Sequence, residues 1–296
     1  MSATTVGFIG LGIMGGPMAA NLLAAGFDVV GYNRSLPARQ RLADRGGHAA
    51  ASVAEVAGIA DVVVTMLPDA EAVEAVTLGT DGILANARPG TLYIDCSTVA
   101  PETARTIFGR AADREVGALD APVSGGDQGA AEASLSIMVG GREADFRAAR
   151  PVLDAMGRTV VHVGPAGTGQ TVKAANQLVV AGMLQAVAEG IVFLDAHGVD
   201  TAAAVRVLSG GLAGNAVLDR KADGMLRRDF TPGGRLELHH KDLGIAQDAA
   251  REVGAAIPAG ATVAQLVGAM VARGDGALDH SALLTLVEEL SGRGER

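Results

Sequence analysis

Short apolar runs alternate with amphipathic, helix-like stretches along the first half of the chain. Most of these runs end in glycine, proline or short polar residues, as buried strands do. Seven runs are expected to be strands: residues 6–9, 29–32, 61–66, 91–95, 118–122, 136–139 and 159–163. Strands that alternate with helices predict an α/β domain with a doubly wound parallel sheet, whose ligands bind beyond the carboxyl ends of the strands.

The pattern changes at Gly164. A glycine-rich break, residues 164–169, is followed by a long helical stretch over about 170–197, and Gly198 is a typical C-terminal stop. Further helical stretches follow with no strand pattern between them. The sequence therefore predicts two domains, an α/β domain over 1–163 and an all-helical domain over 164–296. The apolar helix after the break suits the spine of the second domain or an oligomer contact.

A glycine turn joins the first apolar run to the helix that follows it. Gly10 allows the tight turn, Gly12 lets the backbone approach a phosphate, and Gly15 lets the helix pack closely on the strand. The helix N-terminus offers unpaired N–H groups to the anion. A strand, glycine turn, helix and second strand predict a Rossmann-type dinucleotide-binding domain. The turn residues expected to bind the cofactor are Gly10, Leu11, Gly12, Ile13, Met14 and Gly15.

The end of the second strand indicates which dinucleotide is bound. Asn33, Arg34 and Ser35 stand where NAD-binding domains usually carry an acid for the ribose 2′-hydroxyl. A guanidinium grips a 2′-phosphate with paired hydrogen bonds, whereas an acid repels it. We therefore expect NADP(H) to be preferred, with NAD(H) possible. The alternative is that Arg34 is only a solvated loop residue.

Two later strands should also border the cofactor crevice. Met66, Leu67 and Pro68 end one of them, and Thr98 follows another. The carboxyl ends of parallel strands meet at one edge of a sheet, so these residues should lie near the cofactor. The alternative for Thr98 is a capping role for the next helix.

Composition limits the partners and the compartment. The 296 residues carry a net charge of −9, which argues against a nucleic-acid partner. The single cysteine, Cys96, excludes an intrachain disulfide and is expected to be a buried structural thiol. We see no leader and no uninterrupted apolar run long enough for a bilayer, so we expect a cytoplasmic protein without a membrane partner.

Lys173 and Asn176 are the leading candidates for chemistry. They lie three residues apart at the start of the long helix and so share one face. A nicotinamide enzyme needs a proton donor beside the hydride source, and an apolar setting suits a lysine to that task. The alternative is a lysine that extends from a buried helix to the surface.

Ser124, Gly125 and Gly126 form a turn after a strand, where their N–H groups are able to bind a carboxylate. As a bare pattern this is equally well only a turn. The adjacent pair His239 and His240 cannot face one direction on a helix, and no metal-ligand spacing occurs elsewhere. We expect no metal.

Four motifs occur in order along the chain: residues 8–21, 120–126, 173–177 and 241–243. Together they resemble the β-hydroxyacid dehydrogenase family, which includes 3-hydroxyisobutyrate dehydrogenase, over essentially the whole chain. The second half is most similar to the family's tartronate semialdehyde reductases, in segments such as 210–214 and 279–283.

The resemblance implies a role for each matched residue. Lys173 would be the general acid in reduction and the base in oxidation. Asn176 would hold the substrate's hydroxyl or carbonyl, and Ser124 with the amides of Gly125 and Gly126 would hold its carboxylate. Lys241 would lie near both the nicotinamide and the substrate, and Thr98 would contact the cofactor. The implied substrate is a small anionic oxo or hydroxy acid, and the implied assembly is a homodimer or homotetramer.

Two departures from the family pattern bear on specificity. Ala133 and Ser134 stand where the family usually has Gly-Thr, and His240 stands where an apolar residue is expected. The favoured reaction is reduction of tartronate semialdehyde to glycerate. The alternatives are 3-hydroxyisobutyrate, glyoxylate or succinic semialdehyde as substrate, an imine reductase, and a non-catalytic dinucleotide-binding scaffold. Lys173 and the complete Ser-Gly-Gly turn count against the last two.

Overall fold

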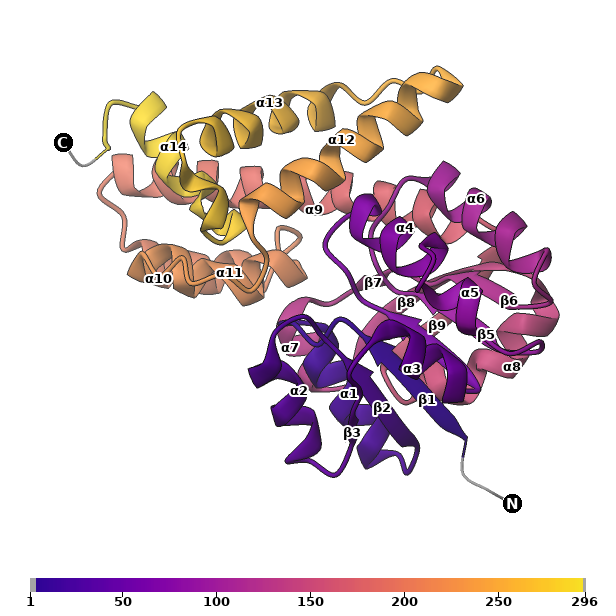
Figure 1. The fold of residues 1–296 in the computed structure, drawn as a ribbon. Helices are drawn as coiled ribbons and strands as arrows, with labels where there is room; N and C mark the ends of the chain where they lie inside the picture. Colours follow the sequence, from indigo (N-terminus) through magenta and orange to yellow (C-terminus); the bar gives the residue numbers. More distant parts are fainter. Residues whose placement is uncertain (1–3, 295–296) are drawn as a thin grey trace. The chain divides into compact units, whose positions relative to one another are not determined.

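The computed structural model describes residues 4–294, and its internal contacts divide the chain between Lys173 and Ala174. The strands all lie in the first unit (Figure 1). They are β1 (Thr5–Ile9), β2 (Asp28–Tyr32), β3 (His48–Ala49), β4 (Val62–Thr65), β5 (Leu92–Asp95), β6 (Gly117–Asp120), β7 (Val123–Ser124), β8 (Leu135–Gly141) and β9 (Gly157–Gly164). All seven predicted strands are present, and the two-residue strands β3 and β7 are additional.

Helices connect the strands of the first unit. They are α1 (Gly15–Ala24), α2 (Leu36–Ala43), α3 (Val53–Ile59), α4 (Ala70–Leu78), α5 (Ile83–Asn86), α6 (Pro101–Ala112), α7 (Gly126–Ala131) and α8 (Glu143–Asp154). The strand order is β3-β2-β1-β4-β5-β6-β8-β7, and β9 pairs with β8. The crossover from β1 through β2 to β4 is the doubly wound arrangement that the sequence predicts.

The sheet is predominantly parallel, as predicted, with an antiparallel departure at β8. Strands β1 to β6 pair in parallel, but β8 runs antiparallel to both β6 and β7. A parallel return needs a crossover of about a dozen residues or more, usually a full helix. The segment between β7 and β8 contains only α7, which has six residues, so the chain turns back directly. Strand β9 is again parallel to β8.

Two cores cover the two faces of the sheet, because successive side chains of a strand point to opposite sides. Phe8 packs in one core with α1 and α8, whereas its neighbour Ile9 packs in the other with α3, α4 and α6. Val29 and Val30 divide in the same way. Strand β4 is buried along its whole length, as expected of a central strand with helices on both faces.

The second unit is helical, as predicted. Helix α9 (Thr168–Ala196) begins in the first unit and continues into the second. The rest of the second unit consists of α10 (Thr201–Ser209), α11 (Ala216–Arg227), α12 (Leu236–Val253), α13 (Pro258–Ala272), η1 (Asp275–Ala277), η2 (His280–Ala282) and α14 (Leu283–Leu290). Its core joins buried side chains of α9, α12, α13 and α14, among them Leu184, Leu243, Val267 and Leu284.

Helix α9 is also long and apolar enough to cross a membrane. It has 29 residues, and its most apolar window has a mean hydropathy of 1.8. The apolar run is not uninterrupted, since Lys173 and Glu189 lie within the helix. The core helix of a water-soluble protein passes the same test, so one such helix is weak evidence for a membrane span.

Candidate functional site

The glycine turn after β1 has the geometry of a phosphate cradle. Gly10 has φ of +99°, and a Cβ there would lie 2.3 Å from the backbone oxygen of Met66. A Cβ on Gly15 would lie 1.8 Å from the backbone oxygen of Gly10, so α1 packs against the turn itself. A Cβ on Gly12 would meet nothing within 4 Å. Gly10 and Gly15 are therefore required by the fold, whereas the space at Gly12 fits an approaching ligand.

The start of helix α1 fits an anion. Its N-cap residue, Met14, makes no side-chain cap hydrogen bond, and no acidic residue stands in the first turn. The partial positive charge of the helix end is therefore not offset by the helix's own side chains. Ile13 is exposed at the same turn. A dinucleotide pyrophosphate fits both this helix end and the open face of Gly12.

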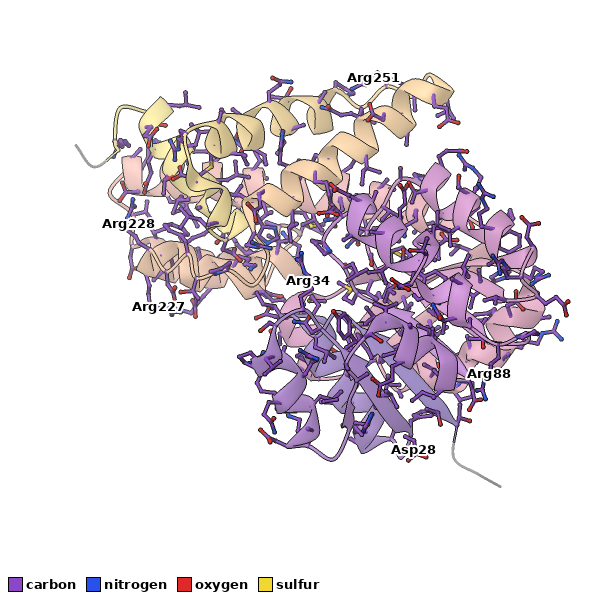
Figure 2. All side chains as sticks on the ribbon, viewed as in Figure 1. Asp28, Arg34, Arg88, Arg227, Arg228 and Arg251 are labelled. Atoms are coloured by element: carbon purple, nitrogen blue, oxygen red, sulfur yellow. The ribbon has the colours of Figure 1, made fainter. Side chains whose placement is uncertain are left out.

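The end of β2 is tied directly to the cradle. The Asn33 side-chain oxygen accepts a hydrogen bond from the Leu11 N–H, at 3.0 Å. Asn33 thus positions the turn as well as standing where the ribose would lie. Arg34 and Ser35 follow and are exposed, and Ser35 is the N-cap of α2. Arg34 is labelled in Figure 2. No acid occupies the end of this strand, so the setting is compatible with a 2′-phosphate.

The carboxyl ends of β4 and β5 are joined by a side-chain hydrogen bond. The Leu67 N–H donates to the hydroxyl of Ser97, at 2.9 Å. Thr98 is half-buried in the segment after β5. It does not cap the following helix, because the N-cap of α6 is Ala100 and Pro101 occupies the first turn. The capping alternative for Thr98 is therefore wrong.

Lys173 is buried, with 8% of its surface exposed, in the second turn of α9. Its ammonium donates a 2.7 Å hydrogen bond to the backbone oxygen of Val123. The alternative of a lysine that reaches the surface is therefore wrong. Val123 directly precedes the Ser124-Gly125-Gly126 turn, so the structure brings the predicted proton donor and the predicted carboxylate site together.

The turn itself requires glycine. Gly125 has φ of +144° and Gly126 has φ of +64°, conformations that other residues rarely adopt. Ser124 is half-buried and Gly126 is exposed. Farther along, Ala133 has φ of +51°, also in the left-handed region. Glycine adopts this backbone conformation without strain, so the loop accepts an alanine there at some conformational cost.

The second unit joins the other substrate candidates through two hydrogen bonds and one ion pair. Asn176 donates to the side-chain oxygen of Gln177 at 2.8 Å, and Gln177 donates to Asp242 at 2.6 Å. The Lys241 ammonium lies 3.2 Å from the other carboxylate oxygen of Asp242. Asp242 is buried, and it contacts the Lys241 ammonium directly and the Asn176 amide through Gln177. Sequence reasoning missed this role, although Asp242 lies within the motif at 241–243.

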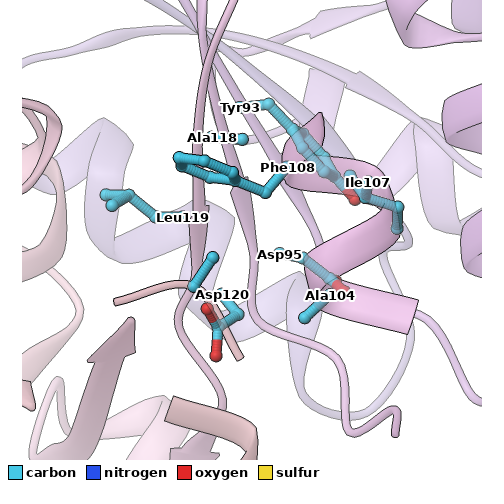
Figure 3. A pocket seen from close by; sticks show the side chains of 9 residues that line it. Tyr93, Asp95, Ala104, Ile107, Phe108, Ala118, Leu119 and Asp120 are labelled. Carbon is cyan, nitrogen blue, oxygen red and sulfur yellow. The ribbon is translucent and has the colours of Figure 1, made fainter. Parts of the chain in front are cut away.

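Two buried carboxylates in the first unit were also missed. Asp95 accepts from the Thr65 hydroxyl at 2.8 Å, and Asp120 accepts N–H bonds from Gly167 and Gln170. Both carboxylates line one pocket (Figure 3). Burial raises the pKa of Asp120 to about 6, although the two N–H bonds oppose the shift. Asp120 starts the motif at 120–126, which is the signal that could have identified it.

Within residues 4–294, no group of three or more His, Cys, Asp or Glu side chains is placed to hold a metal ion. His239 is buried and His240 is exposed, so the adjacent histidines face different directions, as their spacing requires. His239 packs edge-on against His280, with ring centroids 5.2 Å apart. Cys96 is fully buried, as predicted, and burial raises the pKa of its thiol far above the ordinary value.

Two family models match almost the whole chain. The NAD binding domain of 6-phosphogluconate dehydrogenase matches residues 5–164. The NAD-binding domain of NADP-dependent 3-hydroxyisobutyrate dehydrogenase matches residues 167–287. Together they span both units.

Curated relatives are similar over nearly their full lengths. The 2-hydroxy-3-oxopropionate reductase of Escherichia coli is 39% identical, covering 96% of this chain and 97% of its own. The probable 3-hydroxyisobutyrate dehydrogenase-like 2, mitochondrial, of Arabidopsis thaliana is 38% identical, covering 98% and 96%. The NAD-dependent L-serine dehydrogenase of Pseudomonas aeruginosa is 37% identical, covering 97% and 99%. The level of identity therefore does not separate these substrates.

Solved structures agree with the fold. The Mycobacterium tuberculosis 3-hydroxyisobutyrate dehydrogenase with L-serine has a TM-score of 0.84 and 38% identity, covering 97% of this chain and 99% of its own. The protein Psf3, in complex with NADP+ and 2-OPP, has a TM-score of 0.89 and 27% identity, covering 95% and 99%.

Proposed function

The chain belongs to the 3-hydroxyisobutyrate dehydrogenase family of NAD(P)-binding hydroxyacid oxidoreductases, and on that premise we propose that it reduces tartronate semialdehyde to glycerate with NADPH. The observation that carries the proposal is the buried Lys173 ammonium, which is held 2.7 Å from the Val123 oxygen beside the Ser-Gly-Gly turn. The proposal is supported by this geometry, because the proposed proton donor lies beside the turn proposed to bind the substrate carboxylate.

The nicotinamide supplies the hydride when it is bound. In reduction, Lys173 gives a proton to the carbonyl oxygen of the substrate as the carbonyl carbon becomes a primary alcohol carbon. In oxidation, the neutral amine takes the hydroxyl proton. Before either step, the hydrogen bond to Val123 holds the Lys173 side-chain nitrogen at the substrate turn. The held geometry lowers the entropy cost of proton transfer.

The remaining site residues hold the substrate. Ser124 and the N–H groups of Gly125 and Gly126 bind its carboxylate, and Asn176 binds its oxygen at the reacting carbon. The Asn176 amide suits this role because Gln177 accepts from its nitrogen, which leaves the amide oxygen for a substrate hydroxyl. Lys241 adds positive charge that the acidic chain otherwise lacks, and this favours an anionic substrate.

Arg34 is proposed to select NADPH over NADH by binding the 2′-phosphate. This role is supported by the absence of an acid at the end of β2 and by the exposure of Arg34. Arg34→Ala should weaken NADPH binding and leave NADH binding unchanged. Arg41→Ala, an exposed arginine on α2, is the matched control. Equal weakening of both coenzymes by Arg34→Ala would contradict the assignment.

The substrate is tested by following oxidation of NADPH and NADH with tartronate semialdehyde, glyoxylate, succinic semialdehyde and methylmalonate semialdehyde. Oxidation of 3-hydroxyisobutyrate and L-serine is measured in parallel, since relatives carry those names. Fastest turnover of tartronate semialdehyde with NADPH supports the proposal. If the enzyme turns over another acid faster, the proposed mechanism stands and that acid replaces tartronate semialdehyde as the proposed substrate.

The role of Lys173 is tested separately. Lys173→Ala and Lys173→Arg should both bind NADPH normally and lose turnover by roughly 10²-fold or more, as expected for loss of a general acid. Arginine keeps the charge but does not release a proton near neutral pH. Turnover by Lys173→Arg near the wild-type rate would mean that the charge alone is needed.

We further propose a cytoplasmic homodimer or homotetramer. The assembly is supported by large exposed apolar side chains in the second unit, including Val179, Phe193 and Val207. A monomer in light scattering would contradict it. The compartment is tested by cell fractionation, since one relative carries a mitochondrial name.

A further inference from the structure

We propose that Gln170 is a positioning residue that couples coenzyme contact at Thr98 to the placement of the proton donor Lys173. The inference rests on the proposed function, because both roles belong to it. Gln170 lies in the first turn of α9, three residues before Lys173, and 1% of its surface is exposed.

The carboxamide of Gln170 clamps the backbone on both sides of Thr98. Its nitrogen donates to the Ser97 backbone oxygen at 2.8 Å, and its oxygen accepts from the Val99 N–H at 3.2 Å. A carboxamide has one donor end and one acceptor end, so it matches this pair of backbone groups. Thr98 stands between the two bonded residues, and its position is therefore fixed relative to α9.

The start of α9 is itself firmly anchored. The two Asp120 carboxylate oxygens accept from the Gly167 N–H at 2.8 Å and from the Gln170 N–H at 2.9 Å. Two glycines make room for this contact. A Cβ on Gly140 would lie 2.5 Å from one Asp120 oxygen, and a Cβ on Gly169 would lie 2.8 Å from the other. Strand β6 thus holds the helix end on which Gln170 stands.

Lys173 completes the arrangement one turn later. Residues three apart on a helix share a face, so Gln170 and Lys173 project from the same side of α9. Gln170 bonds to the segment after β5, and Lys173 bonds to Val123 after β6. A single helical turn therefore connects the proposed coenzyme contact, the proposed substrate turn and the proton donor.

If Gln170 couples Thr98 to Lys173, its loss should change two measurable quantities. Loss of the Gln170 clamp releases Thr98, so coenzyme binding weakens. It also loosens the turn that carries Lys173, so proton transfer slows even when coenzyme is saturating. A purely structural glutamine would change thermal stability without changing either quantity in the folded enzyme.

The test compares Gln170→Met with the wild-type enzyme. Methionine keeps the length and volume of the side chain but removes both hydrogen bonds. Coenzyme dissociation constants are read from NADPH fluorescence, and kcat is measured at saturating NADPH and acid, well below the unfolding midpoint. We expect the dissociation constant to rise at least about fivefold and kcat to fall at least about tenfold.

The matched control is Gln185→Met, because Gln185 is also buried in α9 but stands about 22 Å farther along the helix. Both quantities should stay within about twofold of the wild type in that variant. Wild-type values for Gln170→Met overturn the inference, and so does a change in only one of the two quantities.

If Gln170→Met does not fold, Gln170→Leu gives the same decision, because a leucine side chain also removes both hydrogen bonds. A failure of the proposed function would give a different result in these measurements. The wild-type enzyme would then bind NADPH and turn over none of the acids, which overturns this inference with it.

Discussion

Asp120 gives a quantitative prediction about the dependence of stability on pH. Its side chain is 5% exposed and stands at the start of α9, where it accepts two N–H bonds. Burial favours the neutral acid and the N–H bonds favour the carboxylate. Burial is the larger effect, so the pKa of Asp120 is raised from 3.8 to about 6.

The raised pKa corresponds to roughly 3 kcal/mol, at about 1.4 kcal/mol for each pH unit. The folded state binds this proton more tightly than the unfolded state does. The contribution of Asp120 to the free energy of unfolding is therefore fully present below pH 3.8 and is lost as the pH rises through about 6. Other acids titrate in the same range, so only a comparison with a variant isolates this contribution.

Asp120→Asn removes the titration and nearly preserves the shape. It also turns an amide NH₂ toward one of the N–H donors, which adds a destabilisation that does not depend on pH. The stability of the wild type minus that of the variant should fall by roughly 3 kcal/mol between pH 3 and pH 7. Urea unfolding followed by far-ultraviolet circular dichroism measures this difference. Asp113→Asn, at an exposed position, is the control substitution.

A difference that is constant with pH would refute the reasoning, because it would mean that Asp120 titrates alike in the folded and unfolded chains. If the difference in stability instead grew with pH, the pKa of Asp120 would be lowered by folding. The two N–H bonds would then have a larger effect on that pKa than burial has.

Three further predictions follow from local geometry. Gly15→Ala should unfold the first unit or cost more than about 3 kcal/mol of unfolding free energy, because the new Cβ would overlap a backbone oxygen. The Cβ added by Gly12→Ala would meet nothing within 4 Å. This variant should therefore keep the wild-type melting temperature and lose coenzyme affinity, measured by NADPH fluorescence titration. Ala133→Gly should raise the unfolding free energy by about 0.5–1 kcal/mol, since it relieves a left-handed backbone, and an unchanged or lower urea midpoint would argue against strain there. Burial opposes ionisation of Asp279, but nearby positive side chains lower its pKa to about 2. At pH 7, Asp279→Asn should therefore have an unfolding free energy roughly 2 kcal/mol below that of the wild type. This difference should disappear as the pH falls from about 4 through 2. A loss of equal size at pH 2 and pH 7 would contradict that assignment.

The predictions from sequence succeeded where the signal is local. The glycine turn, the strand before it and the helix after it depend on residues that are close in the chain, and the roles assigned to Gly10 and Gly15 match their contacts. The burial of Lys173 and Cys96 also follows from their apolar neighbours. Patterns of this kind are set by backbone sterics and by side-chain periodicity.

The features that sequence reasoning missed depend on distant pairs. Asp120 accepts hydrogen bonds from Gly167 and Gln170, which lie about fifty residues later in the chain. The periodicity of the sequence does not predict such a contact. The reversal of β8 is of the same kind. It depends on a connection too short for a crossover, which is recognisable only when the length of α7 is known.

The burial of Cys96 has a practical consequence for studying this enzyme in solution. The chain has no other cysteine and no tryptophan, and the one thiol is sealed in a core and disfavours the reactive thiolate. A cysteine introduced at an exposed position, such as Asp28 or Arg251, would therefore be modified selectively by a thiol-reactive dye in the native protein. One such label in each unit, without any background substitution, would report by energy transfer how the distance between them responds to coenzyme.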